Sequence, residues 1–219
     1  MPTYRDILHD AALQAYIRKS NEVLGAMGYT EHGATHSALT AARASGVLEA
    51  LGYPGRVCEL TKIAGYMHDI GNSVNRNNHA LTGGCLAFVI LERLGFEPEE
   101  TADVVGAVGH HDEATGRPVS ALSAALILAD KSDVRRSRVR EETPEEFDIH
   151  DRVNFAVLEA SLNTDPDAKT VRLSLKIDTS IAPIIEYFEI FTSRMTMCRC
   201  AAEYLGLRFQ LVINEVELL

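Results

Sequence analysis

Hydrophobic residues recur every three or four positions through the first two thirds of the chain, which is the period of an amphipathic α-helix. In 56–68, for example, Leu60, Ile63, Ala64 and Met67 fall on one face. Glycine, proline and polar loops interrupt the pattern at the places where helices are expected to end. The pattern predicts helices over 3–28, 35–51, 56–68, 79–94, 98–111 and 120 to about 138.

The pattern changes near residue 150. Val153–Leu162 and Val171–Ile177 alternate between apolar and polar residues, and a turn signal lies between them. Ile184–Leu205 reads as a long helix, and Arg208–Val216 reads as a third strand. We therefore expect a mainly α fold with two parts: a helical bundle over 1–150 and a small α+β appendage of β-β-α-β order over 151–219.

Composition and charge narrow the class of partner. The chain has 219 residues, of which 46% are hydrophobic and 24% charged, so it is long enough to bury a core without disulfides. Its net charge of −10 argues against duplex nucleic acid or an anionic membrane as a partner. The N-terminus lacks a signal-peptide core, and no apolar run could span a bilayer. We expect a cytoplasmic protein whose four cysteines are reduced thiols.

The candidate chemistry lies in histidines and carboxylates. Alone, each has an ordinary explanation: Asp130, after an apolar run, can mark a solvent edge, and His110 and His111 can be surface or core residues. Together they form a set of five imidazoles and two carboxylates, which suits divalent transition-metal ions. Seven ligands are more than one ion of ordinary coordination number needs, but they suffice for two ions if one carboxylate bridges them. The set is His36, His68, Asp69, His79, His110, His111 and Asp130.

The order of these residues resembles the HD superfamily of metal-dependent phosphohydrolases, in its dinuclear subtype. The resemblance covers about residues 30 to 140. It rests on His36, on His-Asp-Ile-Gly at 68–71, on His79 followed by Gly83 and Gly84, on Gly-His-His-Asp at 109–112, and on Ala-Asp-Lys-Ser-Asp at 129–133.

That resemblance implies a ligand set. His36, His68, Asp69 and Asp130 would hold one ion, and Asp69, His79, His110 and His111 would hold the other, with Asp69 bridging. The expected cofactor is two divalent metal ions, iron first, with manganese, nickel, zinc or magnesium as alternatives. Two departures matter. Asn72 stands where many relatives have lysine, and the Gly-Tyr-Pro of the HD-GYP phosphodiesterases is missing, so a cyclic-di-GMP enzyme is not expected.

The site implies hydrolysis of a small phosphorylated substrate, a nucleotide by preference, by a hydroxide that bridges the metals. Asp69 and His68 are the catalytic candidates. Arg135 and Arg136 follow Asp130 by about one turn and are candidates for binding phosphate, although a solvated helix end explains them equally. Arg76 and Lys131 complete the substrate-binding set. Separately, Asp133 can orient a ligand imidazole or can be a surface residue, and His32 is expected at a pocket edge or a helix cap.

Two other functions stay open. One is a mixed-valent diiron oxygenase, since some members of the superfamily oxidise C–H bonds at a similar site with one imidazole fewer. The other is a sensor that binds a nucleotide without turning it over. The apolar residues of the appendage, such as Phe188 and Phe191, also permit a homodimer.

Overall fold

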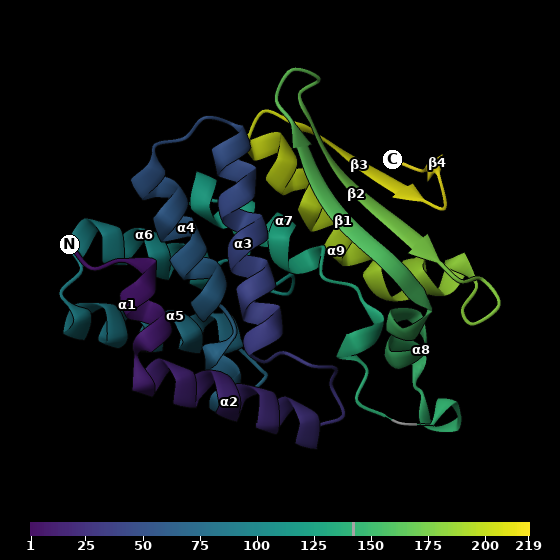
Figure 1. The fold of residues 1–219 in the computed structure, drawn as a ribbon, viewed down its shortest axis with the longest axis horizontal. Coiled ribbons are helices and arrows are strands. Elements are labelled where there is room, and N and C mark those ends of the chain that lie inside the picture. The colour runs from purple at the N-terminus through teal and green to yellow at the C-terminus, as the bar shows by residue number, and fades with distance from the viewer. Residues whose placement is uncertain (142) are drawn as a thin grey trace.

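The N-terminal part of the chain is a bundle of helices (Figure 1). The computed structural model describes residues 1–141 and 143–219. The first two helices are separated at Asp10, because its side chain accepts a hydrogen bond from the backbone N–H of Leu13 and so caps the second helix. The elements are α1 (Tyr4–His9), α2 (Ala11–Ala26), α3 (Ala34–Ala50), α4 (Gly55–Met67), the 3-10 turn η1 (Ile70–Ser73), α5 (His79–Leu94), α6 (Pro98–Gly109) and α7 (Ala121–Lys131).

A four-stranded sheet and two helices make up the C-terminal part. The strands lie in the order β1-β2-β3-β4; β1 and β2 form an antiparallel hairpin, whereas β2 and β3 are parallel. Parallel neighbours need a crossover connection, and α9 provides it. The elements are η2 (Arg136–Arg138), η3 (Pro144–Glu146), α8 (Ile149–Ala156), β1 (Val157–Asp165), β2 (Thr170–Ile177), α9 (Ile184–Tyr204), β3 (Arg208–Ile213) and β4 (Val216–Glu217).

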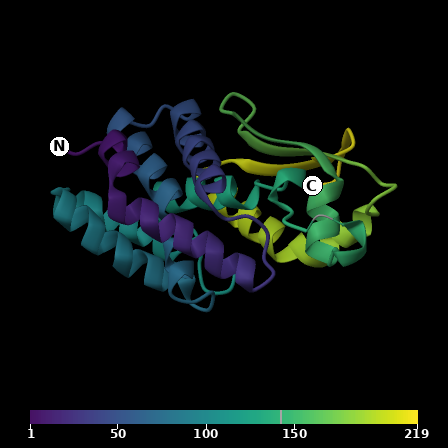
Figure 2. The same ribbon diagram turned by 60° about the horizontal axis from the view of Figure 1, so that its bottom comes forward.

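Helix α7 lies at the centre of the molecule. Its residues 122–129 are all buried, as expected for a helix that is apolar on every side. It packs against α3, α4 and α6 on one side and α9 on the other. One hydrophobic cluster joins Val47 and Leu128 of the bundle to Phe191 and Leu211 of the C-terminal part. The sheet covers α9 and reaches α3 (Figures 1 and 2), so the two parts share a core.

The predicted fold class is confirmed: the molecule is mostly helical with a small C-terminal sheet. Several boundaries were wrong. The single strand expected over Arg208–Val216 ends at Ile213, and Val216 begins the separate strand β4. The helix expected over 3–28 is two helices that meet at Asp10, and the one expected to about 138 ends at Lys131. Residues 153–156, expected in a strand, end helix α8, which begins because the Asp148 side chain accepts a hydrogen bond from the backbone N–H of Asp151.

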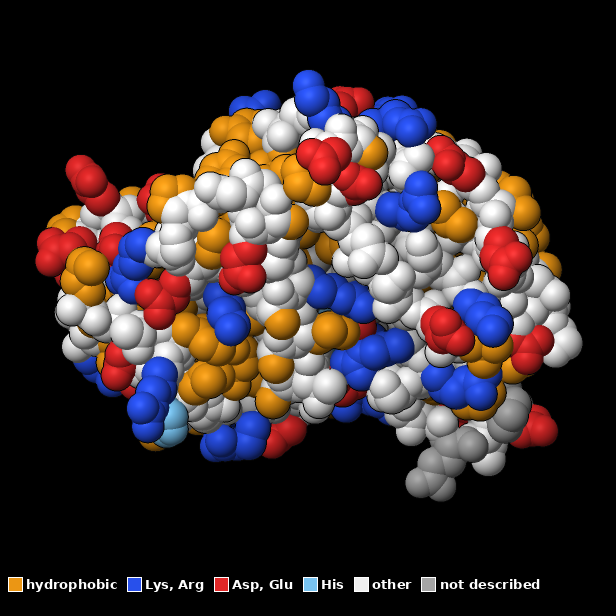
Figure 3. Space-filling view, turned by 45° about the horizontal axis from the view of Figure 1, so that its top comes forward, with side chains coloured by type: hydrophobic (Ala, Val, Ile, Leu, Met, Phe, Trp, Pro, Cys, Tyr) orange, Lys and Arg blue, Asp and Glu red, His pale blue; other side chains and the backbone are white. Residues whose placement is uncertain are grey.

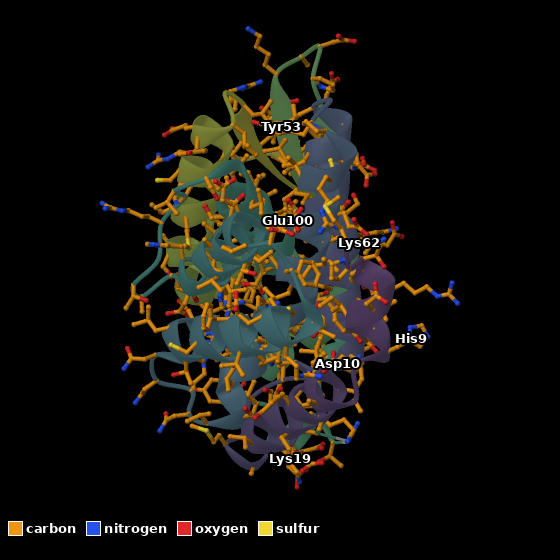
Figure 4. The ribbon with its side chains drawn as sticks, turned by 90° about the vertical axis from the view of Figure 1, so that its left-hand side faces the viewer. His9, Asp10, Lys19, Tyr53, Lys62 and Glu100 are labelled. Atoms are coloured by element: carbon orange, nitrogen blue, oxygen red, sulfur yellow. The ribbon has the colours of Figure 1, made fainter. Side chains whose placement is uncertain are left out.

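The surface carries charges of both signs. On the face drawn in Figure 3, basic and acidic side chains are interspersed rather than gathered by sign. Among the described residues, no helix is both long enough and apolar enough to cross a lipid bilayer. Lys19 and Lys62 point outward from the bundle in Figure 4, which shows its edge.

Candidate metal centre

The centre begins where α4 ends. His68 and Asp69 follow the last residue of α4, and the chain then turns through η1 toward α5. Gly71 permits this turn, because a Cβ atom there would lie 2.0 Å from the carbonyl oxygen of His79 and 2.5 Å from the backbone nitrogen of Gly83. The glycine of the His-Asp-Ile-Gly motif therefore lets the segment that carries Asp69 pack directly against the helix that carries His79.

Asp69 stands between two groups of ligands. Its Oδ2 atom lies 3.3 Å from His68 Nε2 and 3.7 Å from His36 Nε2. Its other oxygen, Oδ1, lies 3.5 Å from His79 Nε2 and 3.7 Å from His111 Nε2. The two carboxylate oxygens thus face different pairs of imidazoles, which is the arrangement of a carboxylate that bridges two cations.

Asp130 completes the first group. Its Oδ1 atom lies 3.4 Å from His36 Nε2 and 3.7 Å from His68 Nε2, and those two nitrogens are 3.1 Å apart. In the second group, the Nε2 atoms of His79 and His111 are also 3.1 Å apart. All the imidazoles in the two groups are buried.

The proton positions on these rings follow from their outer partners. The Nδ1 atoms of His68, His79 and His111 lie 2.6 to 3.0 Å from backbone carbonyl oxygens, which can only accept. Each Nδ1 must therefore carry a hydrogen, so in the neutral ring Nε2 presents a lone pair. His36 Nδ1 lies 2.7 Å from Asp133 Oδ2, which fixes His36 in the same way. Four imidazole lone pairs and two carboxylates converge, so positive charge must lie among them.

The pKa values of these residues also indicate that positive charge belongs among them. Burial raises the pKa of Asp69, but His68 and His111 outweigh burial and hold it well below its usual range. Burial lowers the pKa of His68, yet Asp69 and Asp130 raise it to about 10. His79 goes the other way: burial and the neighbouring His111 lower its pKa to about 4, despite the attraction of Asp69. The residues could hold metal ions, and divalent cations would satisfy every one of these groups.

His110 is the predicted ligand that the structure does not bring into either group. Its ring is half-buried, and within 1–141 and 143–219 no hydrogen bond or ion pair joins it to Asp69, His79 or His111. Its Nδ1 atom is buried and has no partner among the described residues. His110 as a ligand stays a prediction, and its unpartnered nitrogen is compatible with that role.

A pocket of about 280 Å³ leads toward the centre. A hollow of about 20 Å³ adjoins it, shares four of its residues and is lined by Asp69, His79, His111 and Asp130. The hollow has room for roughly one water molecule or ion. The pocket is lined by Met27, Gly28, Tyr29, Thr30, His32, Arg76, Arg138, Asp148, His150, Asn154, Phe191 and Arg194.

Two of the four predicted substrate-binding residues lie at this opening. Arg76 lines both the pocket and the hollow, and Lys131 lines the hollow. Arg135 instead donates to Asp133 and pairs with Glu31. Arg136 lies over the ring of Phe155 and donates to its carbonyl oxygen. Neither Arg135 nor Arg136 lines the pocket or the hollow.

Three further residues reach the opening without having been predicted to bind substrate. Arg138 and His32 line both cavities, and so does Arg194, which comes from α9. His150 lines the outer pocket as well. His9 has no role here, since it projects from the outer surface at the end of α1 (Figure 4). No motif marks Arg194; only the packing of α9 on α7 places it at the opening.

Comparison with known proteins gives a relative but no activity. No protein-family model matches the chain. A protein of Methanocaldococcus jannaschii that is described only as uncharacterized is 28% identical over 196 residues, which is 78% of this chain and 74% of the relative. The chain is therefore similar to a protein whose description names no activity.

Proposed function

We propose that this protein is a metal-dependent phosphohydrolase of the HD superfamily that acts on a small phosphorylated substrate. One observation carries the proposal: the two oxygens of Asp69 face two separate pairs of imidazole lone pairs. A carboxylate placed in this way suits two cations a few ångströms apart. Two-metal sites of this kind serve the hydrolysis of phosphate esters.

The donor set fits first-row divalent ions. Neutral imidazoles and carboxylates are preferred by iron, manganese, zinc and nickel, and no thiolate takes part. His36, His68, Asp69 and Asp130 would hold one ion, and Asp69, His79 and His111 would hold the other, with His110 as an added ligand. Such ions polarise a phosphoryl oxygen and lower the pKa of water, so that hydroxide is available near neutral pH.

The remaining residues have positioning roles. Asp133 accepts the Nδ1–H of His36 and keeps its Nε2 directed at Asp69 and Asp130. Lys131 is buried, and its Nζ atom lies 2.8 Å from Asp130 Oδ2, so it restrains the carboxylate from the side opposite His36. Arg76 lies where the pocket meets the hollow and can meet an anionic substrate there.

An oxygenase is the second candidate, and one observation favours it. The second group brings together two imidazoles, His79 and His111, while His110 stays outside. Oxygenases of the superfamily use one imidazole fewer than the dinuclear hydrolases, which leaves a coordination position for oxygen. A carboxylate placed to bridge two ions suits both candidates and does not separate them.

A metal-resolved assay under nitrogen tests the proposal. Protein purified without oxygen is loaded in turn with iron, manganese, zinc, nickel or magnesium and assayed on p-nitrophenyl phosphate and bis(p-nitrophenyl) phosphate. We expect turnover with at least one metal, its loss in Asp69→Ala, and its retention in Asp103→Ala, which changes an exposed carboxylate on α6. No turnover with any metal, or equal turnover in Asp69→Ala, would refute the proposal. Turnover of a substrate only with oxygen would support the oxygenase.

A further inference from the structure

Arg194 brings the C-terminal part of the chain to the metal centre. It lies on α9, outside residues 30–140, and lines both the pocket and the hollow beside Asp69. Its Nε atom lies 3.2 Å from Glu113 Oε1, and its guanidinium stacks on the buried ring of Phe191 at 4.6 Å from the ring centroid. Among the described residues, no partner is found for its two terminal amino groups.

Arg76 faces the same opening from the other side. It reaches the hollow from the loop before α5, where Nη1 lies 3.3 Å from His79 Nε2 and 3.5 Å from Asn72 Oδ1. Its guanidinium lies over the ring of Tyr29. Within the described residues, Arg76 has no carboxylate partner, so its charge is not balanced by the protein at close range. Two guanidinium groups with spare donors therefore flank one small opening.

The third arginine at the opening differs from these two. Arg138 is buried, and it donates from Nε to the carbonyl oxygen of Glu31 and from Nη1 to that of Asp133. It lies 3.6 Å from Asp133 Oδ2 as well. Its hydrogen bonds hold the segment after α7 in place, so it adds positive potential but is already engaged. Only its Nη2 atom has no partner among the described residues, so most of the guanidinium donors that remain for a ligand belong to Arg76 and Arg194.

We propose that Arg194 and Arg76 together bind the non-bridging oxygens of a terminal phosphate, so that the substrate is a small phosphomonoester rather than a phosphodiester. This inference rests on the proposed function, since it assigns the substrate of the same site. A terminal phosphate has three non-bridging oxygens and a charge near −2, whereas a diester has two such oxygens and a charge of −1. Only the monoester gives each guanidinium an oxygen of its own and still leaves one for the metal centre.

The outer pocket indicates what the phosphate is attached to. Its volume of about 280 Å³ is at the small end of ligand pockets, which favours a single compact group over a dinucleotide. Its lining includes Asp148 and Asn154, whose side-chain oxygens can accept hydrogen bonds, and the half-exposed ring of Tyr29. The group that fills it is therefore expected to carry hydroxyl or amino donors, as a sugar or nucleoside does.

Arg194 is held ready by a chain of ion pairs. Glu113 lies between Arg194 and Lys131, whose Nζ atom is 2.6 Å from Glu113 Oε2 and 2.8 Å from Asp130 Oδ2. This chain runs from α9 through the loop after α6 to the metal-facing carboxylate on α7. A guanidinium fixed on one side by a carboxylate and below by an aromatic ring has little freedom to lose when it binds phosphate.

The test uses Arg194→Gln, with Arg199→Gln as the matched control, since Arg199 lies on the same helix and is exposed. We expect kcat/KM for p-nitrophenyl phosphate to fall about 10- to 150-fold in Arg194→Gln, the range for loss of one charge-assisted hydrogen bond. The fall for bis(p-nitrophenyl) phosphate should be smaller, and Arg199→Gln should match the wild type. Equal losses for the two esters, or none, would overturn the assignment.

A binding measurement separates this inference from the proposed function. Calorimetric titration of the metal-loaded protein with inorganic phosphate needs no turnover. We expect Arg194→Gln to bind phosphate more weakly than the wild type by a similar factor, with unchanged metal content, and Arg194→Lys to lie between them because it keeps the charge without the paired donors. If the wild type binds phosphate but hydrolyses no ester, the proposed function and the substrate assignment fail, and only the phosphate-binding role of Arg194 stands. If Arg194→Gln binds phosphate as the wild type does, only the role of Arg194 fails. Should Arg194→Gln not fold, Arg194→Lys decides by the same comparison.

Discussion

Replacing Asp133 by asparagine should weaken one metal site and spare the other. Asp133 is buried, and its Oδ2 atom accepts the Nδ1–H of His36 at 2.7 Å, while Arg135 and Arg138 lie at 2.8 and 3.6 Å from its carboxylate. Asparagine has nearly the same shape and keeps an acceptor, but it removes the charge that makes the imidazole of His36 a stronger base. Among the described residues, no hydrogen bond or ion pair joins Asp133 to His79 or His111.

The expected magnitude follows from that single contact. Loss of a carboxylate that orients a ligand histidine typically lowers metal affinity about 10- to 100-fold, or about 1.4 to 2.7 kcal/mol. The site that contains His36 should lose that factor, and the site that contains His79 should change little. Asp133→Asn also removes the charge that faces the buried Arg138, so its free energy of unfolding is measured beside its metal affinity. Asp133→Ala would in addition remove the acceptor atom itself, and would confuse folding with metal binding further.

Competition with a chromophoric chelator under nitrogen measures both affinities in one titration. Asp103→Asn is the control, because Asp103 is an exposed carboxylate on α6. We expect a biphasic curve for the wild type and for Asp103→Asn, and a shift of one phase alone for Asp133→Asn. Equal shifts of both phases, or no shift, would refute the claim that Asp133 acts through His36.

Three further predictions concern the packing at Gly71, the charge of Glu113 and the role of His110. Gly71→Ala should destabilise the protein by at least about 2 kcal/mol in urea unfolding, because the new methyl group would lie 2.0 Å from a backbone atom of α5. Gly106→Ala, whose new methyl group would have nothing within 4 Å, should stabilise the protein by about 0.5 kcal/mol. Equal effects of the two substitutions would contradict this packing. Burial raises the pKa of Glu113, but Lys131 and Arg194 outweigh burial and lower it to about 2. Glu113→Gln should therefore lower the free energy of unfolding of the metal-free protein by about 2 kcal/mol at pH 7. This loss should shrink as the pH falls from about 5 toward 2, because the glutamate itself becomes protonated there. A loss as large at pH 3 as at pH 7 would refute the prediction. Metal analysis should show a greater loss for His111→Ala than for His110→Ala; the reverse order would make His110 the main ligand.

The helices were predictable where a strong period and clear end signals agree. The helix over 79–94 begins and ends as expected, and Gly95 at its end has the positive φ angle that glycine permits. The errors have local causes that compete with the period. Asp10 and Asp148 each cap a helix through one side-chain hydrogen bond. Asp10 lies inside a periodic segment and Asp148 lies just before one, and neither position gives warning of that role.

The site was predictable only as far as its motifs reach. Residues that follow helix ends in recognisable strings, such as His68 with Asp69, lie together as expected. Arg135 and Arg136 were chosen from their distance to Asp130 along a helix, but that helix ends at Lys131, so the spacing no longer points them at the site. Arg194 could not be found from sequence, because its place depends on how α9 packs across α7.

The proposed function depends on the carboxylate of Asp69, which would be shared between two metal ions. The most direct measurement is the number of metal ions per chain, by elemental analysis of anaerobically purified wild type and Asp69→Asn side by side. We predict close to two ions per chain in the wild type and no more than one in the variant, because asparagine keeps only one side-chain oxygen and cannot bridge two ions. A wild type without bound transition metal, or a variant that still holds two ions, would contradict it.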